Sequence, residues 1–192
     1  MNTGTTIKST YWLWEKGIPE ELCDMAIRDM GNMKFSDGKI GGIKVGSKVT
    51  AIRKSRITFA EPNYWLEGIA YNYASYANRS ADWNYKVDWA EPIQLAKYEK
   101  DHHYDWHEDW APLEVCGDNR VRKLSVIILL SDSSEFTGGE FQFQNRSGSD
   151  TTIKMNKGSV LVFPSYVTHR VTPIISGTRY SAANWIVGKN TL

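Results

Sequence analysis

Short apolar runs, continuous or alternating with polar residues, follow one another through the second half of the chain. Residues with turn propensity separate them, in the stretches TGG, RSGSD, NKG and SG. Such a pattern predicts short β-strands joined by turns. The predicted strands cover residues 92–99, 122–131, 139–144, 158–164, 169–175 and 178–188.

Two segments of the first half have helical patterns instead. Residues 18–32 carry Pro19 near the first turn, acidic residues early and Gly31 as a stop signal, which predicts a helix. Residues 61–79 predict a second helix. One stripe of that helix would contain Trp65, Ile69, Asn72 and Tyr76.

The segment between these helices is basic. From Lys39 to Arg56 the chain has six Lys or Arg and no Asp or Glu. A solvated flexible loop or hairpin is one interpretation. A mobile lid that meets an acidic partner is the other.

Many short strands preceded by two helices predict a mainly β fold with flanking helices (α+β), built as a double-sheet barrel or jelly roll. A doubly wound α/β fold is disfavoured because the helices do not alternate with the strands. We expect a single domain over residues 1–192. Helical support and the basic segment would occupy about 1–90, and the β-core about 91–188.

Composition agrees with a packed globular protein, with 41% hydrophobic and 12% aromatic residues. A net charge of +1 argues against attraction of nucleic acid by the whole chain. Cys23 and Cys116 are too few for a disulfide framework or a zinc–thiolate site. No apolar run has the length of a signal-peptide core or a membrane span. We therefore expect a soluble cytoplasmic protein without a membrane partner.

The stretch HHYDWHEDW, residues 102–110, contains three of the four histidines. If it is extended, His107 and Asp109 point the same way. With a third ligand from a facing strand, they would form the two-histidine, one-carboxylate set of non-haem Fe(II) sites. His-x-Asp is a weak motif by itself, and a hydrogen-bonded strand histidine is the commoner explanation of a lone histidine.

His169 and Arg179 favour the metal site. A Ser-Gly pair between their apolar runs predicts a hairpin, which would return Arg179 beside the strand of His169. On that return strand Arg179, Ser181, Ala183 and Trp185 share a face, with small residues between a guanidinium and an indole. A buried arginine needs an anion, and its planar fork fits a carboxylate. A dicarboxylate such as 2-oxoglutarate could bind the metal at one end and Arg179 at the other.

With these motifs in order, the chain resembles the Fe(II)/2-oxoglutarate-dependent dioxygenases of the prolyl-4-hydroxylase family over about residues 50–188. Three blocks carry the resemblance: QLAKYEKDHHYDWHED, RKLSVIILLSDSSEFTGGEFQFQ and KGSVLVFPSYVTHRVTPIISGTRYSAANWIVG. The resemblance implies a double-stranded β-helix (jelly-roll, cupin-like) core with supporting helices.

The resemblance also implies roles for individual residues. The iron ligands would be His107, Asp109 and His169. The 2-oxoglutarate site would contain Arg179, Tyr98 and Ser125, while Leu129 stands where some relatives have a cosubstrate-binding tyrosine. Positions near the substrate mouth would be Tyr104, Arg122 and Trp185.

The implied reaction is Fe(II)- and 2-oxoglutarate-dependent hydroxylation of a prolyl residue in a peptide or protein, at C4. The reaction would convert 2-oxoglutarate and O2 to succinate and CO2, with ascorbate as a further reductant. Electrostatic attraction by the basic segment would favour an acidic peptide as the substrate. Two alternatives stay open: a related oxygenase acting on a free amino acid, a lysyl residue or a nucleobase, and a non-enzymatic cupin-type binding module. The sequence does not indicate the oligomeric state.

Overall fold

The computed structural model describes residues 9–38, 52–110, 120–145 and 148–190. Residues 39–51, most of the segment interpreted as a loop or a lid, lie outside these ranges, as does Cys116. Within the described ranges, no helix has both the length and the apolar character needed to cross a membrane.

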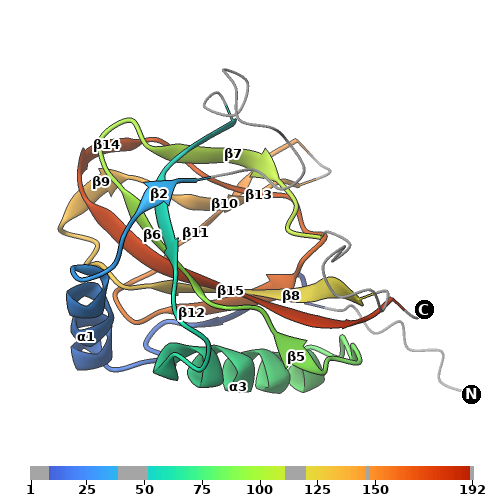
Figure 1. Ribbon diagram of the computed structural model, residues 1–192. Helices are drawn as coiled ribbons and strands as arrows, with labels where there is room; N and C mark the ends of the chain where they lie inside the picture. The colour runs from blue at the N-terminus through green and yellow to red at the C-terminus, as the bar shows by residue number, and fades with distance from the viewer. Residues whose placement is uncertain (1–8, 39–51, 111–119, 146–147, 191–192) are drawn as a thin grey trace, which may run out of the picture.

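Three layers are stacked in the described part of the molecule: two helices, a large sheet and a small sheet (Figure 1). The helices α1 (Glu20–Met30) and α3 (Trp65–Ser80) lie below the large sheet in this view. The large sheet contains, in spatial order, β1 (Trp12–Trp14), β12 (Val160–Pro164), β8 (Arg120–Leu129), β15 (Arg179–Lys189), β6 (Gln94–Tyr98), β4 (Arg56–Phe59) and β2 (Ser36–Asp37), with β5 (Trp89–Ala90) also paired to β15. The small sheet contains β11 (Thr151–Ile153), β10 (Phe141–Phe143), β13 (His169–Val171), β7 (His103–His107) and β3 (Arg53–Lys54), while β14 (Ile174–Gly177) pairs with β9 (Phe136–Gly138).

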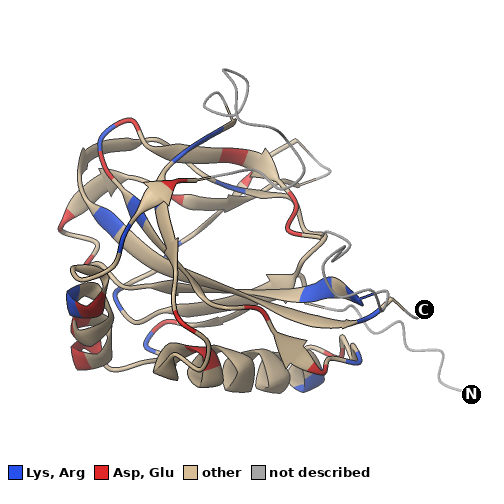
Figure 2. Cartoon of the chain, in the orientation of Figure 1, with Lys and Arg blue, Asp and Glu red and all other residues tan. Residues whose placement is uncertain are grey.

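Apolar residues on both faces of the central strands explain why the large sheet lies between two other layers. On β8, Leu124, Val126 and Ile128 are buried in the cluster that contains the helices, whereas Ile127 packs into the cluster between the sheets. Because alternate residues of a strand point to opposite faces, the large sheet is apolar on both sides. It therefore packs against the helices on one face and against the small sheet on the other. Acidic and basic residues are scattered over the helices and both sheets (Figure 2), consistent with a net charge of +1.

Both predicted helices are present. Helix α1 begins after Pro19 and ends before Gly31, as the capping pattern predicted. Helix α3 does not bury the predicted stripe, because Asn72 and Tyr76 of that stripe are exposed. It buries the neighbouring face of the helix instead. The fully buried positions are Leu66, Ala70, Ala74 and Ala77. Alanine side chains allow the helix to lie close to the sheet, and this close contact decides which face is buried.

All six predicted strands are present, and the segment 169–175 is divided into β13 and β14. The prediction of a mainly β fold with flanking helices is confirmed. The two- to four-residue strands of the first half were not predicted, because such short segments contain too few positions to show a period.

The predicted hairpin between the strands of His169 and Arg179 was wrong. β13 pairs with β10 and β7 in the small sheet, whereas β15 pairs with β8, β6 and β5 in the large sheet. The chain passes between sheets at Gly177, which has a φ of 79°. A Cβ atom at Gly177 would lie 2.0 Å from the carbonyl oxygen of Glu135. Arg179 thus approaches the histidines from the opposite sheet.

Candidate active site

Three side chains with the chemistry of metal ligands meet between the two sheets. His107 is the last residue of β7, Asp109 follows two residues later, and His169 is the first residue of β13. His107 and His169 are paired across neighbouring strands, so the third ligand comes from the adjacent strand of the same sheet. One potential ligand atom of each residue lies within 4.8 Å of the others. The structure therefore brings together the three predicted ligands.

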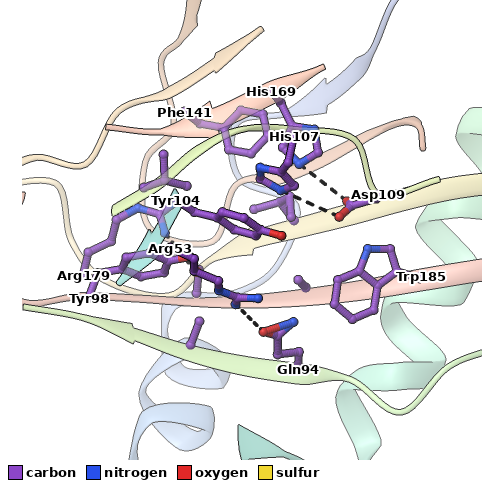
Figure 3. Close-up of a pocket in the computed structure, with 15 residues that line it drawn as sticks. Arg53, Gln94, Tyr98, Tyr104, His107, Asp109, Phe141, His169, Arg179 and Trp185 are labelled. Carbon is purple, nitrogen blue, oxygen red and sulfur yellow. Dashed lines mark hydrogen bonds and ion pairs between the residues drawn. The ribbon is translucent and has the colours of Figure 1, made fainter. Parts of the chain in front are cut away.

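Hydrogen bonds orient both imidazoles. Nδ1 of His107 lies 2.7 Å from the carbonyl oxygen of Asp105, and Nδ1 of His169 lies 2.8 Å from that of Val167. Because a carbonyl oxygen only accepts, each Nδ1 carries a proton, and a neutral imidazole in this tautomer has its lone pair on Nε2. The Nε2 atoms of His107 and His169 lie 3.8 and 3.5 Å from the carboxylate oxygens of Asp109 (Figure 3). Burial, together with the charge of His169, lowers the pKa of His107 to about 3, so this imidazole is neutral at physiological pH.

Asp109 is buried and ionised. Burial raises the pKa of its carboxyl, but the opposing effects of His169, His107, Trp185 and Ser125 together lower it below its ordinary value. Ser125 Oγ donates a hydrogen bond of 2.8 Å to Asp109 Oδ2. Ser125 therefore lies behind the carboxylate and is not among the cavity-lining residues. Its role as a 2-oxoglutarate partner stays a prediction.

This donor set fits Fe(II). It consists of two imidazoles and one carboxylate, the combination typical of non-haem Fe(II) sites with open coordination positions. The cluster has three members among the described residues, whereas a structural zinc site would have four protein ligands. The chemistry of the donors therefore fits a catalytic metal better than a structural one.

Arg179 is a buried cation at the other end of the cavity. It is 2% exposed, and its Nη1 donates to Ser181 Oγ at 2.9 Å. No acidic side chain in the described part of the chain forms an ion pair with it. Burial lowers the pKa of the guanidinium, and Tyr98 partly offsets that effect. An uncompensated buried charge is costly, so this end of the cavity is suited to an anion.

The inner face of β15 matches its predicted composition. Arg179, Ser181, Ala183 and Trp185 all line the cavity that also contains His107, Asp109 and His169. Figure 3 shows the guanidinium at one end of the cavity and the His–Asp–His cluster at the other. The buried indole Nε1 of Trp185 lies on the side facing Asp109 (Figure 3) and contributes to the lowered pKa of that carboxyl.

Tyrosines form part of the same wall. Tyr104 stacks on His107 with ring centroids 3.4 Å apart and planes 9° from parallel. Burial raises the pKa of Tyr104 to about 12, so its hydroxyl stays protonated and can donate a hydrogen bond. Tyr98 lines the cavity below Arg179, whose guanidinium lies 5.6 Å from the ring centroid.

Arg122 lies outside the cavity lining. It donates two hydrogen bonds, of 2.5 and 2.6 Å, to the carboxylate of Glu91. Its guanidinium also stacks over Trp185 at 3.9 Å. The observed geometry therefore has Arg122 supporting the indole, and its predicted contact with substrate stays a prediction.

Two of the cavity residues that were not predicted as site residues have polar or charged side chains. Arg53 and Gln94 are 7% and 3% exposed, and Arg53 Nη2 donates to Gln94 Oε1 at 2.6 Å. Arg53 also lies over the ring of Tyr104, at 4.4 Å from its centroid. Gln94 gave a signal in the sequence as a polar residue within an apolar run. Arg53 had none, because its neighbours Lys54 and Arg56 made it look like part of a solvated segment.

The site lies within a segment that matches a known family. The family model described as the 2OG-Fe(II) oxygenase superfamily matches residues 93–187, which include all three clustered residues and Arg179. A PKHD-type hydroxylase of Synechococcus sp. is 37% identical over 94 residues, which cover 49% of this chain and 40% of that protein. A PKHD-type hydroxylase of Pseudoalteromonas atlantica is 29% identical over 97 residues, covering 50% of this chain and 42% of that protein. The match thus spans about two fifths of the length of these relatives.

Solved structures resemble nearly the whole chain. A viral collagen prolyl hydroxylase from Paramecium Bursaria Chlorella virus-1, in a 2OG complex, has a TM-score of 0.71 at 18% identity and covers 96% of this chain and 99% of that one. A prolyl-4-hydroxylase of Pseudomonas putida has a TM-score of 0.68 at 18% identity, with coverages of 92% and 91%. A prolyl hydroxylase of Trichoplax adhaerens, in complex with a hypoxia inducible factor peptide fragment, has a TM-score of 0.63 at 19% identity, with coverages of 92% and 83%. These likenesses confirm the predicted jelly-roll core.

Proposed function

Because the chain belongs to the 2OG-Fe(II) oxygenase superfamily, we propose that it hydroxylates a prolyl residue in a peptide or protein, at C4. Fe(II) would be the metal, with 2-oxoglutarate and O2 as cosubstrates that are converted to succinate and CO2. A requirement for ascorbate as reductant is part of the same proposal.

One observation carries the proposal: Arg179 is buried with no acidic partner among the described residues, across a cavity from His107, Asp109 and His169. A ligand that satisfies both ends must present one anionic group to the guanidinium and donor atoms to a metal. A dicarboxylate with a keto group next to one carboxylate has this arrangement, and 2-oxoglutarate is such a molecule.

The side chains would divide the work as follows. The two Nε2 atoms and the carboxylate of Asp109 would hold Fe(II), which supplies the redox chemistry that couples decarboxylation of 2-oxoglutarate to hydroxylation of a C–H bond. Arg179 would bind the distal carboxylate in two hydrogen bonds, and Tyr98 would add a further one. Apolar lining residues such as Ile127 and Phe141 would exclude water from the reacting atoms.

A prolyl substrate is supported by the names of the relatives and by the cavity wall. The solved structures with this fold include prolyl hydroxylases, and the Trichoplax protein holds a peptide fragment. In this chain Tyr104 and Trp185 present aromatic groups to the cavity, and aromatic faces pack well against a proline ring.

The test is incubation of the protein in air with Fe(II), ascorbate, 2-oxoglutarate and a library of proline-containing peptides. Mass spectrometry would follow succinate and the gain of one oxygen atom per peptide, with His169→Ala as the control. We expect oxygen gain on proline that is lost in the control.

Other outcomes separate the parts of the proposal. Succinate without peptide oxidation would retain the oxygenase and contradict the prolyl substrate, so that free amino acids, lysyl residues and nucleobases would be tested next. No succinate from folded, iron-loaded protein would contradict the enzyme and favour a cupin-type binding module.

A further inference from the structure

Asp109 is the one member of the metal-binding cluster that lies outside a regular strand. β7 ends at His107, so no ladder of the small sheet holds the backbone at Asp109. Instead, the backbone N–H groups of Asp109 and Trp110 both donate to the carbonyl oxygen of Ser165, at 2.9 and 2.8 Å. Ser165 directly follows β12 of the large sheet. The ligand is therefore held by a strand end of the opposite sheet.

Side-chain hydrogen bonds also join Asp109 to the opposite sheet. Ser125 Oγ, on β8, donates to Asp109 Oδ2 at 2.8 Å and lies 3.0 Å from Ser165 Oγ. A serine hydroxyl has a single proton, and that of Ser125 is used on the carboxylate. Ser165 must therefore donate to Ser125. The two hydrogen bonds then run in one direction, from Ser165 to Ser125 and from Ser125 to Asp109. Ser125 and Ser165 are 0% and 1% exposed, so water does not compete for these bonds.

We propose that Ser125 and Ser165 are positioning residues that hold the carboxylate of Asp109 in the orientation required for metal binding. The inference rests on the proposed Fe(II) site. Rotation of the carboxylate about its Cβ–Cγ bond would break the hydrogen bond from Ser125 and leave a buried hydroxyl proton without an acceptor, which is unfavourable. The bond from Ser165 polarises the Ser125 hydroxyl and strengthens its hold on the carboxylate.

The test measures Co(II) binding to metal-free protein by titration calorimetry, without cosubstrate. Ser125→Ala should raise the dissociation constant by about 10–100-fold, the usual effect of removing a partner of a metal ligand. Ser165→Ala keeps the backbone carbonyl and should shift the constant less, in the same direction. Ser125→Thr, which keeps the hydroxyl, should restore tight binding.

Ser159→Ala is the matched control. Ser159 is also fully buried and makes two hydrogen bonds, to the backbone of Glu15 and Asn156, away from the cluster. Its removal should lower the melting temperature and leave Co(II) affinity unchanged. This comparison separates a loss of stability from a loss of positioning.

The results that overturn the inference are distinct. A folded Ser125→Ala variant with the Co(II) affinity of the wild type contradicts the positioning role and leaves the proposed metal site standing. If Ser125→Ala does not fold, unchanged affinity in Ser165→Ala contradicts it. If wild-type protein binds Co(II) no better than His169→Ala, the proposed metal site itself is wrong, and the inference is overturned with it.

Discussion

At the scale of single residues, the cavity has a fixed cation at one end and an ionised carboxylate at the other. Arg179 has no acidic partner in the described residues, whereas Asp109 is held by Ser125 and lies beside two histidines. A monocarboxylate could satisfy the arginine but would leave the metal-binding end to water. A dicarboxylate that spans the cavity satisfies both, and each residue-scale prediction concerns one of these two ends.

Arg179→Ala should weaken 2-oxoglutarate binding. Loss of one partner of a buried charge pair costs about 2–5 kcal/mol, which is roughly 30-fold or more in affinity. Binding would be measured anaerobically by the visible band that 2-oxoglutarate produces with bound Fe(II).

Arg170→Ala serves as the control for that experiment. Arg170 follows His169 in the sequence but is not among the cavity-lining residues. Its guanidinium stacks on Trp106 at 4.3 Å from the ring centroid and donates a hydrogen bond to Gln142. Its loss removes the same charge and should leave 2-oxoglutarate affinity unchanged. Equal effects of the two substitutions would refute the assignment of Arg179.

The four residues His107, Asp109, His169 and Arg179 could be predicted from the His-x-Asp spacing, the chain order and the resemblance to a known family, although the hairpin expected to place Arg179 was wrong. Their supporting contacts could not. Ser125 bonds to Asp109 because two sheets approach each other at that point, which no local pattern encodes. Arg53 enters the cavity for a similar reason, since β3 pairs with β7 across about fifty positions of sequence.

At the scale of secondary-structure elements, the connection between β14 and β15 decides where Arg179 lies. The Ser-Gly pair lies at the end of β14 and does not form the turn of a hairpin, because a local turn signal does not say which sheet the next strand joins. Gly177 adopts a positive φ directly against the backbone of Glu135. That close contact redirects the chain from β14 to the large sheet.

Gly177→Ala should therefore destabilise the protein more than a positive φ alone would. Gly148 has a φ of 86°, and no atom of the described residues lies within 4 Å of an added Cβ, so Gly148→Ala measures the conformational cost by itself, about 1–2 kcal/mol. We expect Gly177→Ala to cost about 1–3 kcal/mol more in urea unfolding, because the clash is with backbone. Equal losses of stability in the two variants would contradict the account of this connection between β14 and β15.

Helix α3 contacts the large sheet through alanines, and a larger side chain there should separate the layers. Ala74→Leu should lower the free energy of unfolding by about 1–3 kcal/mol. Asn72→Leu, on the exposed side of the same helix, should change it by less than about 0.5 kcal/mol. If the two variants unfold at the same urea concentration, the close packing of α3 is not what stabilises this face.

At the scale of the whole molecule, the positions and order of six strands were predictable, and the partition of those strands between two sheets was not. Apolar periodicity predicts that a strand is buried, but β8 and β13 look alike in this respect although they belong to different sheets. In the folded chain both sheets contribute to the cavity: the small sheet supplies the imidazoles, and the large sheet supplies Arg179 and Trp185. The proposed chemistry therefore requires the complete jelly roll.

The most direct test of this account is an anaerobic titration of Fe(II)-loaded protein with 2-oxoglutarate, followed in the visible spectrum. We predict a charge-transfer band that saturates with 2-oxoglutarate, disappears in His169→Ala and requires much higher 2-oxoglutarate concentrations in Arg179→Ala. Absence of the band from folded, iron-loaded wild-type protein would contradict the central claim that one ligand joins the metal to Arg179.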